Sequence, residues 1–119
     1  MLTELWLGDN KIGDEGAKAV ADALKSGTAV VTTLWLNSNN IGPEGAIAIA
    51  EALKVNAVVT TLALGDNNIG DEGVIAISEA LKVNAVLTSL WLGSNNLGDA
   101  GKTAVQDAVK GRSGFHLVL

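Results

Sequence analysis

Cysteine is absent from this 119-residue chain, and so are tyrosine and any long uninterrupted run of apolar residues. Without cysteine, neither a disulfide framework nor a thiolate metal site can form, and a reducing compartment is permitted. Without an apolar run of about 18 residues, we expect no membrane-spanning helix and no membrane partner. No basic, apolar signal-like segment precedes the first repeated pattern at Leu2, so we expect a cytoplasmic protein.

Basic and aromatic residues are also scarce. Eight basic residues stand against 13 acidic ones, and the net charge of −5 repels phosphate backbones, so we expect no nucleic-acid partner. The single histidine, His116, has no nucleophile placed beside it to form a catalytic pair. We therefore predict no enzyme activity, no cofactor and no metal site. The only aromatic residues are Trp6, Trp35, Trp91 and Phe115.

What the sequence does contain is one unit, repeated. Leu-x-Leu pairs recur at steps of 29, 28, 28 and 27 residues, at Leu5/Leu7, Leu34/Leu36, Leu62/Leu64, Leu90/Leu92 and Leu117/Leu119. A period of this length indicates a solenoid built from stacked supersecondary units. We therefore divide the chain, as a single domain, into repeats 2–30, 31–58, 59–86 and 87–113 and a terminal strand 114–119.

Each unit changes its hydrophobic period part-way along. Leu5-Trp6-Leu7 alternates as a short strand does, whereas Gly16, Val20 and Leu24 follow at helical spacing. A lone strand and helix cannot bury their apolar faces, but stacked units cover one another. The expected fold is an α/β solenoid with a five-stranded parallel sheet on its concave face and four helices on its convex face.

The full pattern, L-x-x-L-x-L-x-x-N-x-I-G-x-x-G, resembles the leucine-rich repeat of the ribonuclease-inhibitor type. NOD-like immune receptors and Ran GTPase-activating proteins carry similar repeats, and the resemblance covers essentially the whole chain. It implies a right-handed β-α superhelix. It also implies a buried ladder of Asn10, Asn39, Asn67 and Asn95, whose amides would bond the turn that leaves each strand.

All three tryptophans fall at one position of the repeat. The leucines of Leu5-Trp6-Leu7 face the core, so Trp6 points out of the concave face. Exposed aromatic side chains among small polar neighbours are typical of an interaction surface. We predict a protein- or peptide-binding face, with a gap at Ala63 for a partner's side chain and acids that favour a basic partner. Its predicted residues are Trp6, Trp35, Trp91, Ala63, Glu4, Asp9, Asn37 and Asp66.

Other functions remain open. The near identity of the units and the lack of a capping element before the first repeat fit a self-associating scaffold, fragment or engineered array. Tryptophan stacking on sugar rings would give a carbohydrate-binding protein, and the resemblance to the Ran activators would give a GTPase activator. For self-association we expect a homo-oligomer, a two-fold dimer, through an uncapped apolar end that includes Leu24. Its edges would be Leu2, Leu5, Leu7, Phe115, Leu117 and Leu119.

Overall fold

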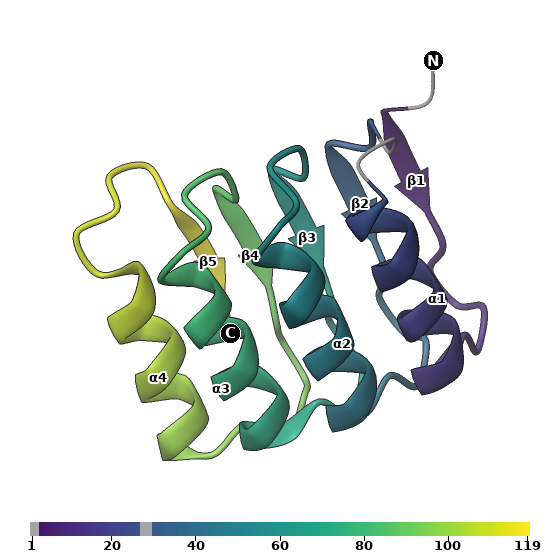
Figure 1. Ribbon diagram of the computed structural model, residues 1–119. Coiled ribbons are helices and arrows are strands. Elements are labelled where there is room, and N and C mark those ends of the chain that lie inside the picture. Colours follow the sequence, from purple (N-terminus) through teal and green to yellow (C-terminus); the bar gives the residue numbers. More distant parts are fainter. Residues whose placement is uncertain (1–2, 27–29) are drawn as a thin grey trace.

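The computed structural model describes residues 3–26 and 30–119, and strands alternate with helices throughout them. The elements are β1 (Glu4–Trp6), α1 (Gly13–Lys25), β2 (Thr33–Trp35), α2 (Pro43–Leu53), β3 (Thr61–Ala63), α3 (Gly70–Leu81), β4 (Ser89–Trp91), α4 (Asp99–Val109) and β5 (His116–Val118). The strands form one sheet in chain order, and the helices lie side by side along one face of it (Figure 1). The predicted α/β leucine-rich-repeat solenoid is confirmed. Leu2, a predicted edge residue, lies outside the described residues.

Equivalent residues of the repeats lie beside one another in the sheet. All four strand pairs are parallel, and Leu5, Leu34 and Leu62 are successive partners, continued by Leu90 and Leu117. Since side chains alternate between the two faces of a strand, each repeat position becomes a row across the sheet. The middle leucine row faces the helices, and Leu34, Leu62 and Leu90 are fully buried beneath them.

Burial falls off toward the two ends of the solenoid. Leu5, Leu7 and Leu117 are only partly buried against the core, as expected for terminal units with a neighbour on one side. The expectation that Leu24 faces water is wrong, because its side chain is 5% exposed. It lies in the last turn of α1 and belongs to the hydrophobic core.

The predicted asparagine ladder is present in the interior of the solenoid. The side-chain oxygen of Asn67 accepts hydrogen bonds from the backbone N–H groups of Asn39 and Ile41, at 2.9 and 3.0 Å. Its amide nitrogen donates to carbonyls of its own turn and of the preceding one. Asn39 and Asn95 are buried in the same way, but Asn10 is exposed, which corrects its predicted burial. No repeat of the described chain covers Asn10 from the other side.

A second amide ladder, which we did not predict, lies at the opposite edge. Buried Asn56 and Asn84 follow α2 and α3, and their side-chain oxygens each accept two backbone N–H groups of the turn into the next strand. Arg112 takes this place in the last repeat. Its guanidinium donates to the carbonyls of Leu81 and Leu87, as well as to that of Asn84, and lies 5.0 Å from the ring centre of Phe115.

Two aspartates connect successive helices. The Oδ1 atom of Asp14 accepts the N–H groups of Gly42 and Gly45, at 2.7 and 3.0 Å, at the start of α2. Asp71 does the same for α4, through Gly98 and Gly101. A carboxylate at a helix N-terminus satisfies free N–H groups and interacts favourably with the helix dipole. These acids therefore cap the helix of the next repeat.

Candidate functional site: the concave tryptophan row

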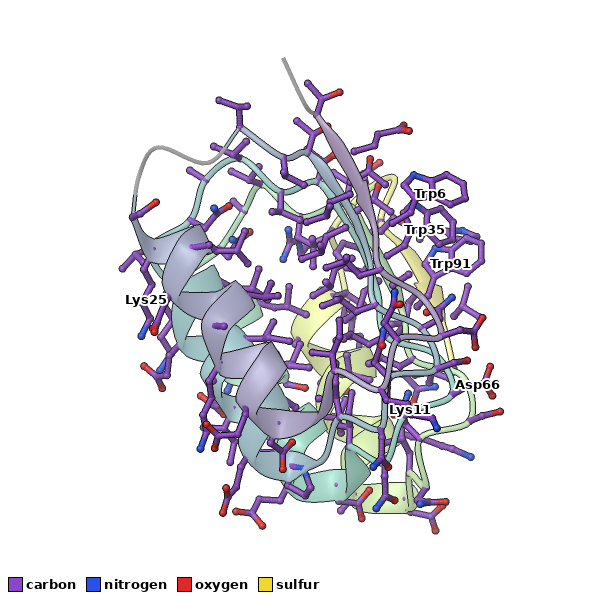
Figure 2. The ribbon with its side chains drawn as sticks, turned by 90° about the vertical axis from the view of Figure 1, so that its right-hand side faces the viewer. Trp6, Lys11, Lys25, Trp35, Asp66 and Trp91 are labelled. Carbon is purple, nitrogen blue, oxygen red and sulfur yellow. The ribbon has the colours of Figure 1, made fainter. Side chains whose placement is uncertain are left out.

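The three tryptophans project together from the face of the sheet opposite the helices. Trp6 and Trp35 are partners between β1 and β2, and Trp91 pairs with Ala63 of β3. Figure 2 shows the three indoles one behind another on that face, with Lys25 on the helix side of the molecule. We call Trp6, Trp35 and Trp91 the tryptophan row. The strand phase predicted from the Leu-x-Leu pairs therefore holds.

The rings of the row touch one another. The centroids of Trp6 and Trp35 are 5.0 Å apart with their planes at 28°, a stacked pair. Trp35 and Trp91 meet edge-on, at 5.5 Å and 64°. The imidazole of His116 continues the contact from Trp91 at 6.1 Å, although it was not among the predicted site residues. In the repeat, His116 occupies the position of Ser89, two residues before Trp91, and the two residues pair in the sheet. Its place beside the row could therefore have been predicted.

The gap predicted at Ala63 does not exist. Ala63 is fully buried, and the rings of Trp35 and Trp91 contact each other although β3 lies between their strands. Because a methyl group is short, the large rings on either side close over it. The tryptophan row is therefore a continuous aromatic surface that offers no cleft to a partner's side chain.

Exposure differs along the row. Trp6 is 67% exposed, whereas Trp35 and Trp91 are half-buried, so all three are partly accessible, as predicted. One face of the Trp6 ring stacks on Trp35, and Trp35 contacts an indole on each side. Stacking on a sugar needs an uncovered aromatic face, and the stack with Trp6 already covers one face of Trp35. This contact pattern disfavours carbohydrate binding along the middle of the row.

The indole N–H groups of Trp35 and Trp91 differ in their hydrogen bonding. The Nε1–H of Trp91 donates to the hydroxyl of Ser89 at 2.9 Å. The buried Nε1–H of Trp35 finds no hydrogen-bond partner among the residues that the structure describes. An unsatisfied buried donor lowers stability, so the position of Trp35 in the row is not explained by hydrogen bonding.

Three carboxylates on the strands and turns of this face form no ion pair in the described part of the chain. Glu4, Asp9 and Asp66 are exposed, and within residues 3–26 and 30–119 none of them takes part in an ion pair. The lysines of the helix layer have acids of their own, such as Lys54 with Glu51 at 3.2 Å and Lys82 with Glu79 at 3.0 Å. These three carboxylates are therefore available to attract positive charge, and the exposed Lys11 stands in the same turn as Asp9.

The remaining predicted site residues lie in the turns after the strands. Asp9 and Asp66 adopt left-handed backbone conformations, with φ of 61° and 55°, and Asp66 lies beyond the tryptophan row in Figure 2. Asn37 is half-buried, and its side-chain oxygen accepts the backbone N–H of Gly65 at 2.7 Å. That bond joins neighbouring turns, so the side-chain oxygen of Asn37 already has a hydrogen-bond partner within the protein.

Other kinds of site find little support in the described part of the chain. No group of three or more His, Asp or Glu side chains there is placed to hold a metal ion, and no helix there is long and apolar enough to cross a membrane. A cavity of about 290 Å³ opens beside Leu97 and Leu119, and another of about 270 Å³ beside Val83 and Arg112. Neither is lined by a tryptophan.

Comparisons with known proteins agree with this geometry. A family model described as a leucine-rich repeat matches residues 1–21, 29–50, 55–78 and 83–104. No curated protein matches the chain. Among solved structures, the actin-binding site 2 of leiomodin-1 is similar, with a TM-score of 0.84 and 28% sequence identity. The match covers 98% of this chain and 69% of the leiomodin chain.

Proposed function

Because this chain belongs to the leucine-rich repeat family, we propose that it is a protein-binding repeat module that holds its partner against the tryptophan row. No catalytic step is part of the proposal. The strands and the two amide ladders form a rigid support, and the indoles supply the contact surface. Aromatic residues dominate the binding energy of many protein interfaces, because they bury a large area with few rotatable bonds.

The observation that carries the proposal is the concentration of the indoles on one open face. The chain has three tryptophans, and all of them lie in this row, with Trp6 67% exposed. A tryptophan kept only for packing would gain more stability in the core, where the side chains are leucine, isoleucine, valine and alanine. Exposure of such a large apolar side chain is typical of an interaction surface.

The chemistry around the row favours a basic partner with a flat or extended contact segment. Since Ala63 is covered, a partner cannot insert a side chain between Trp35 and Trp91 and has to lie across the row. The unpaired acids Glu4, Asp9 and Asp66 would attract positive charge and steer the encounter. The negative net charge of the chain adds to this attraction.

Actin is the first defined protein to test. The similar solved structure is named as an actin-binding site of leiomodin-1, and the likeness extends over nearly all of this chain. Fluorescently labelled monomeric actin can be titrated with the purified chain, followed by anisotropy. Binding that is lost in Trp6→Ala and retained in Val83→Ala would identify actin as a partner of the row. Val83 is a suitable control because it is equally exposed, at 67%, but follows α3 at the far edge.

A partner other than actin calls for an unbiased selection. Peptides can be selected from a random display library on the immobilised chain, and each one can then be tested on the same two variants. We expect selected peptides to be rich in arginine and lysine and to lose affinity for Trp6→Ala but not for Val83→Ala. If selected peptides bind both variants as tightly as the wild type, the tryptophan row is not the binding surface.

Self-association is the second candidate, and the flanks of the solenoid favour one end for it. Lys102 and Gln106 of α4 are exposed. In α1, α2 and α3 the residues at the same two repeat positions are small and buried. Those buried residues are Ala17, Ala46 and Val74, and Ala21, Ala50 and Ser78. The C-terminal helix flank is therefore polar, whereas the flank of α1 exposes Ala19 and Ala23. We propose that any dimer of this chain forms through the N-terminal flank.

A further inference from the structure

The outer face of the Trp6 ring differs from the other indole faces of the row. Trp6 belongs to β1, the first strand of the sheet, and only β2 pairs with it in the described chain. One ring face stacks on Trp35, while the opposite face is turned away from the row. Trp6 as a whole is 67% exposed. A flat cationic group could cover this face without moving any side chain of the protein.

Glu4 lies next to this open face. It precedes Trp6 by two residues on β1, so both side chains project from the same face of the strand, with Cα atoms about 6.6 Å apart. Glu4 is exposed, and its carboxylate has no ion pair among the residues that the structure describes. A carboxylate on a side chain of this length reaches the space beside the indole.

Among the residues that the structure describes, no ion pair places a cation beside Glu4. Lys11 is the next basic residue along the sequence, but it follows the opposite end of β1, and Figure 2 shows it well away from Trp6. The carboxylate of Glu4 therefore has no cationic partner within the described residues and can attract one from outside the chain.

We propose that Trp6 and Glu4 form a subsite for the guanidinium group of an arginine from a partner protein. The proposal rests on the proposed function, since it names one contact made on the same concave face. A guanidinium is planar, so it stacks on an indole face by cation–π attraction while its edge donates two N–H groups to a carboxylate. A lysine ammonium has no flat face and makes only a point contact with one of the two residues.

The test uses three short peptides, acetyl-Gly-Arg-Gly-amide and its lysine and citrulline counterparts. Each is titrated into the isotope-labelled chain while the three indole N–H resonances are followed by NMR, with Trp6 assigned from a Trp6→Phe variant. The arginine peptide should shift the Trp6 signal most, the lysine peptide should bind more weakly, and the uncharged citrulline peptide should have no measurable effect.

Two variants that each remove one negative charge distinguish a direct contact with the guanidinium from general electrostatic attraction. Glu4→Gln should weaken binding of the arginine peptide roughly fivefold, as expected for loss of one charged contact beside an aromatic face. Glu72→Gln removes the same charge from an exposed site at the start of α3 and should leave binding unchanged. An equal effect of the two variants, equal binding of citrulline, or a shift confined to Trp35 and Trp91 would each overturn the proposal.

These outcomes are independent of the wider function. A partner protein that needs Trp6 and Trp35 but tolerates Glu4→Gln would keep the tryptophan row as the binding surface and refute the arginine subsite. Conversely, an arginine peptide that binds at Trp6, in a chain whose partners all bind elsewhere, would uphold the subsite and refute the proposed function.

Discussion

The indole rings of Trp35 and Trp91 meet across β3, with their centroids 5.5 Å apart, although a whole strand separates the two residues. Strand spacing alone would place residues two strands apart at about 9.6 Å. The rings lean toward each other over Ala63, which they bury completely. One short side chain in the middle repeat therefore converts three separate indoles into a continuous surface.

Replacing Ala63 with leucine should separate these two rings. The larger side chain cannot fit beneath them, so we expect loss of the edge-on contact and a decrease in stability of about 1 kcal/mol. Near-ultraviolet circular dichroism, which reports coupling between indoles, and denaturant unfolding would measure the two effects. Ala57→Leu is the control, because Ala57 is exposed and lies between α2 and β3, outside the strand that the rings cover. An unchanged indole signal in Ala63→Leu would contradict the ring contact.

Trp6 should dominate the solvent-sensitive fluorescence of the protein. It is 67% exposed, whereas the other two tryptophans are half-buried and shielded by their neighbours. We expect Trp6→Phe to shift the emission to shorter wavelength and to remove most of the quenching by acrylamide. Trp91→Phe should change the quenching far less. Equal changes in quenching for the two variants would mean that Trp6 is not more exposed than Trp91 in solution.

The interior of the asparagine ladder should be much more sensitive to substitution than its end. Asn67→Ala leaves the backbone N–H groups of Asn39 and Ile41 and the carbonyl of Leu36 without the partner that Asn67 supplies. Since each such group costs about 1–3 kcal/mol, we expect a loss of at least about 3 kcal/mol in the free energy of unfolding. Denaturant titration would measure it.

Asn68→Ala and Asn10→Ala are the matched controls for that loss. Both residues are exposed, and Asn10 donates only to carbonyls of its own turn. We expect each to cost less than about 1 kcal/mol. A loss at Asn10 as large as that at Asn67 would mean that the first turn is covered in solution, for example by a second copy.

Gly101 should not tolerate alanine. A Cβ atom there would lie 2.3 Å from Oδ1 of Asp71 and 2.7 Å from Cγ1 of Val74, so α4 would have to move away from α3. We expect Gly101→Ala to cost about 1–3 kcal/mol, as overpacking does, and Asp71→Ala to cost about 1 kcal/mol through the lost cap. The double variant should cost less than the sum, because removing the carboxylate relieves part of the clash. Strict additivity in thermal unfolding would refute this coupling.

Self-association, where it occurs, should depend on the N-terminal flank. Ala23 of α1 is exposed, while its equivalents Ala52 and Ala80 in the inner repeats are buried. Sedimentation equilibrium should show a mass above 12.1 kDa that rises with concentration in the wild type. Ala23→Glu should restore the monomer, and Gln106→Glu on the opposite flank should not. A wild type that stays monomeric at high concentration defeats the idea.

Much of the fold followed from the sequence because its signals are local and recur. The alternation in Leu5-Trp6-Leu7 fixes which face each side chain takes, and a recurrence of about 28 residues fixes the register, so the inward leucines and the outward tryptophans were both predictable. The same recurrence contained the second ladder, since Asn84 follows Asn56 and precedes Arg112 at intervals of 28. The second ladder was therefore also predictable from the sequence.

Only the tertiary structure decided how the repeated parts meet. Whether Ala63 is a gap or is covered depends on ring rotamers that lean across two strands, and a repeat pattern contains no such distance. The pattern likewise assigns Asp14 to its own helix, whereas stacking brings its carboxylate to Gly42 and Gly45 of the next one. Asn10 and Asn67 occupy the same position in the repeat, yet one is exposed and the other is buried. Periodicity determines what each unit contains, while burial and contact depend on the neighbours that close packing supplies.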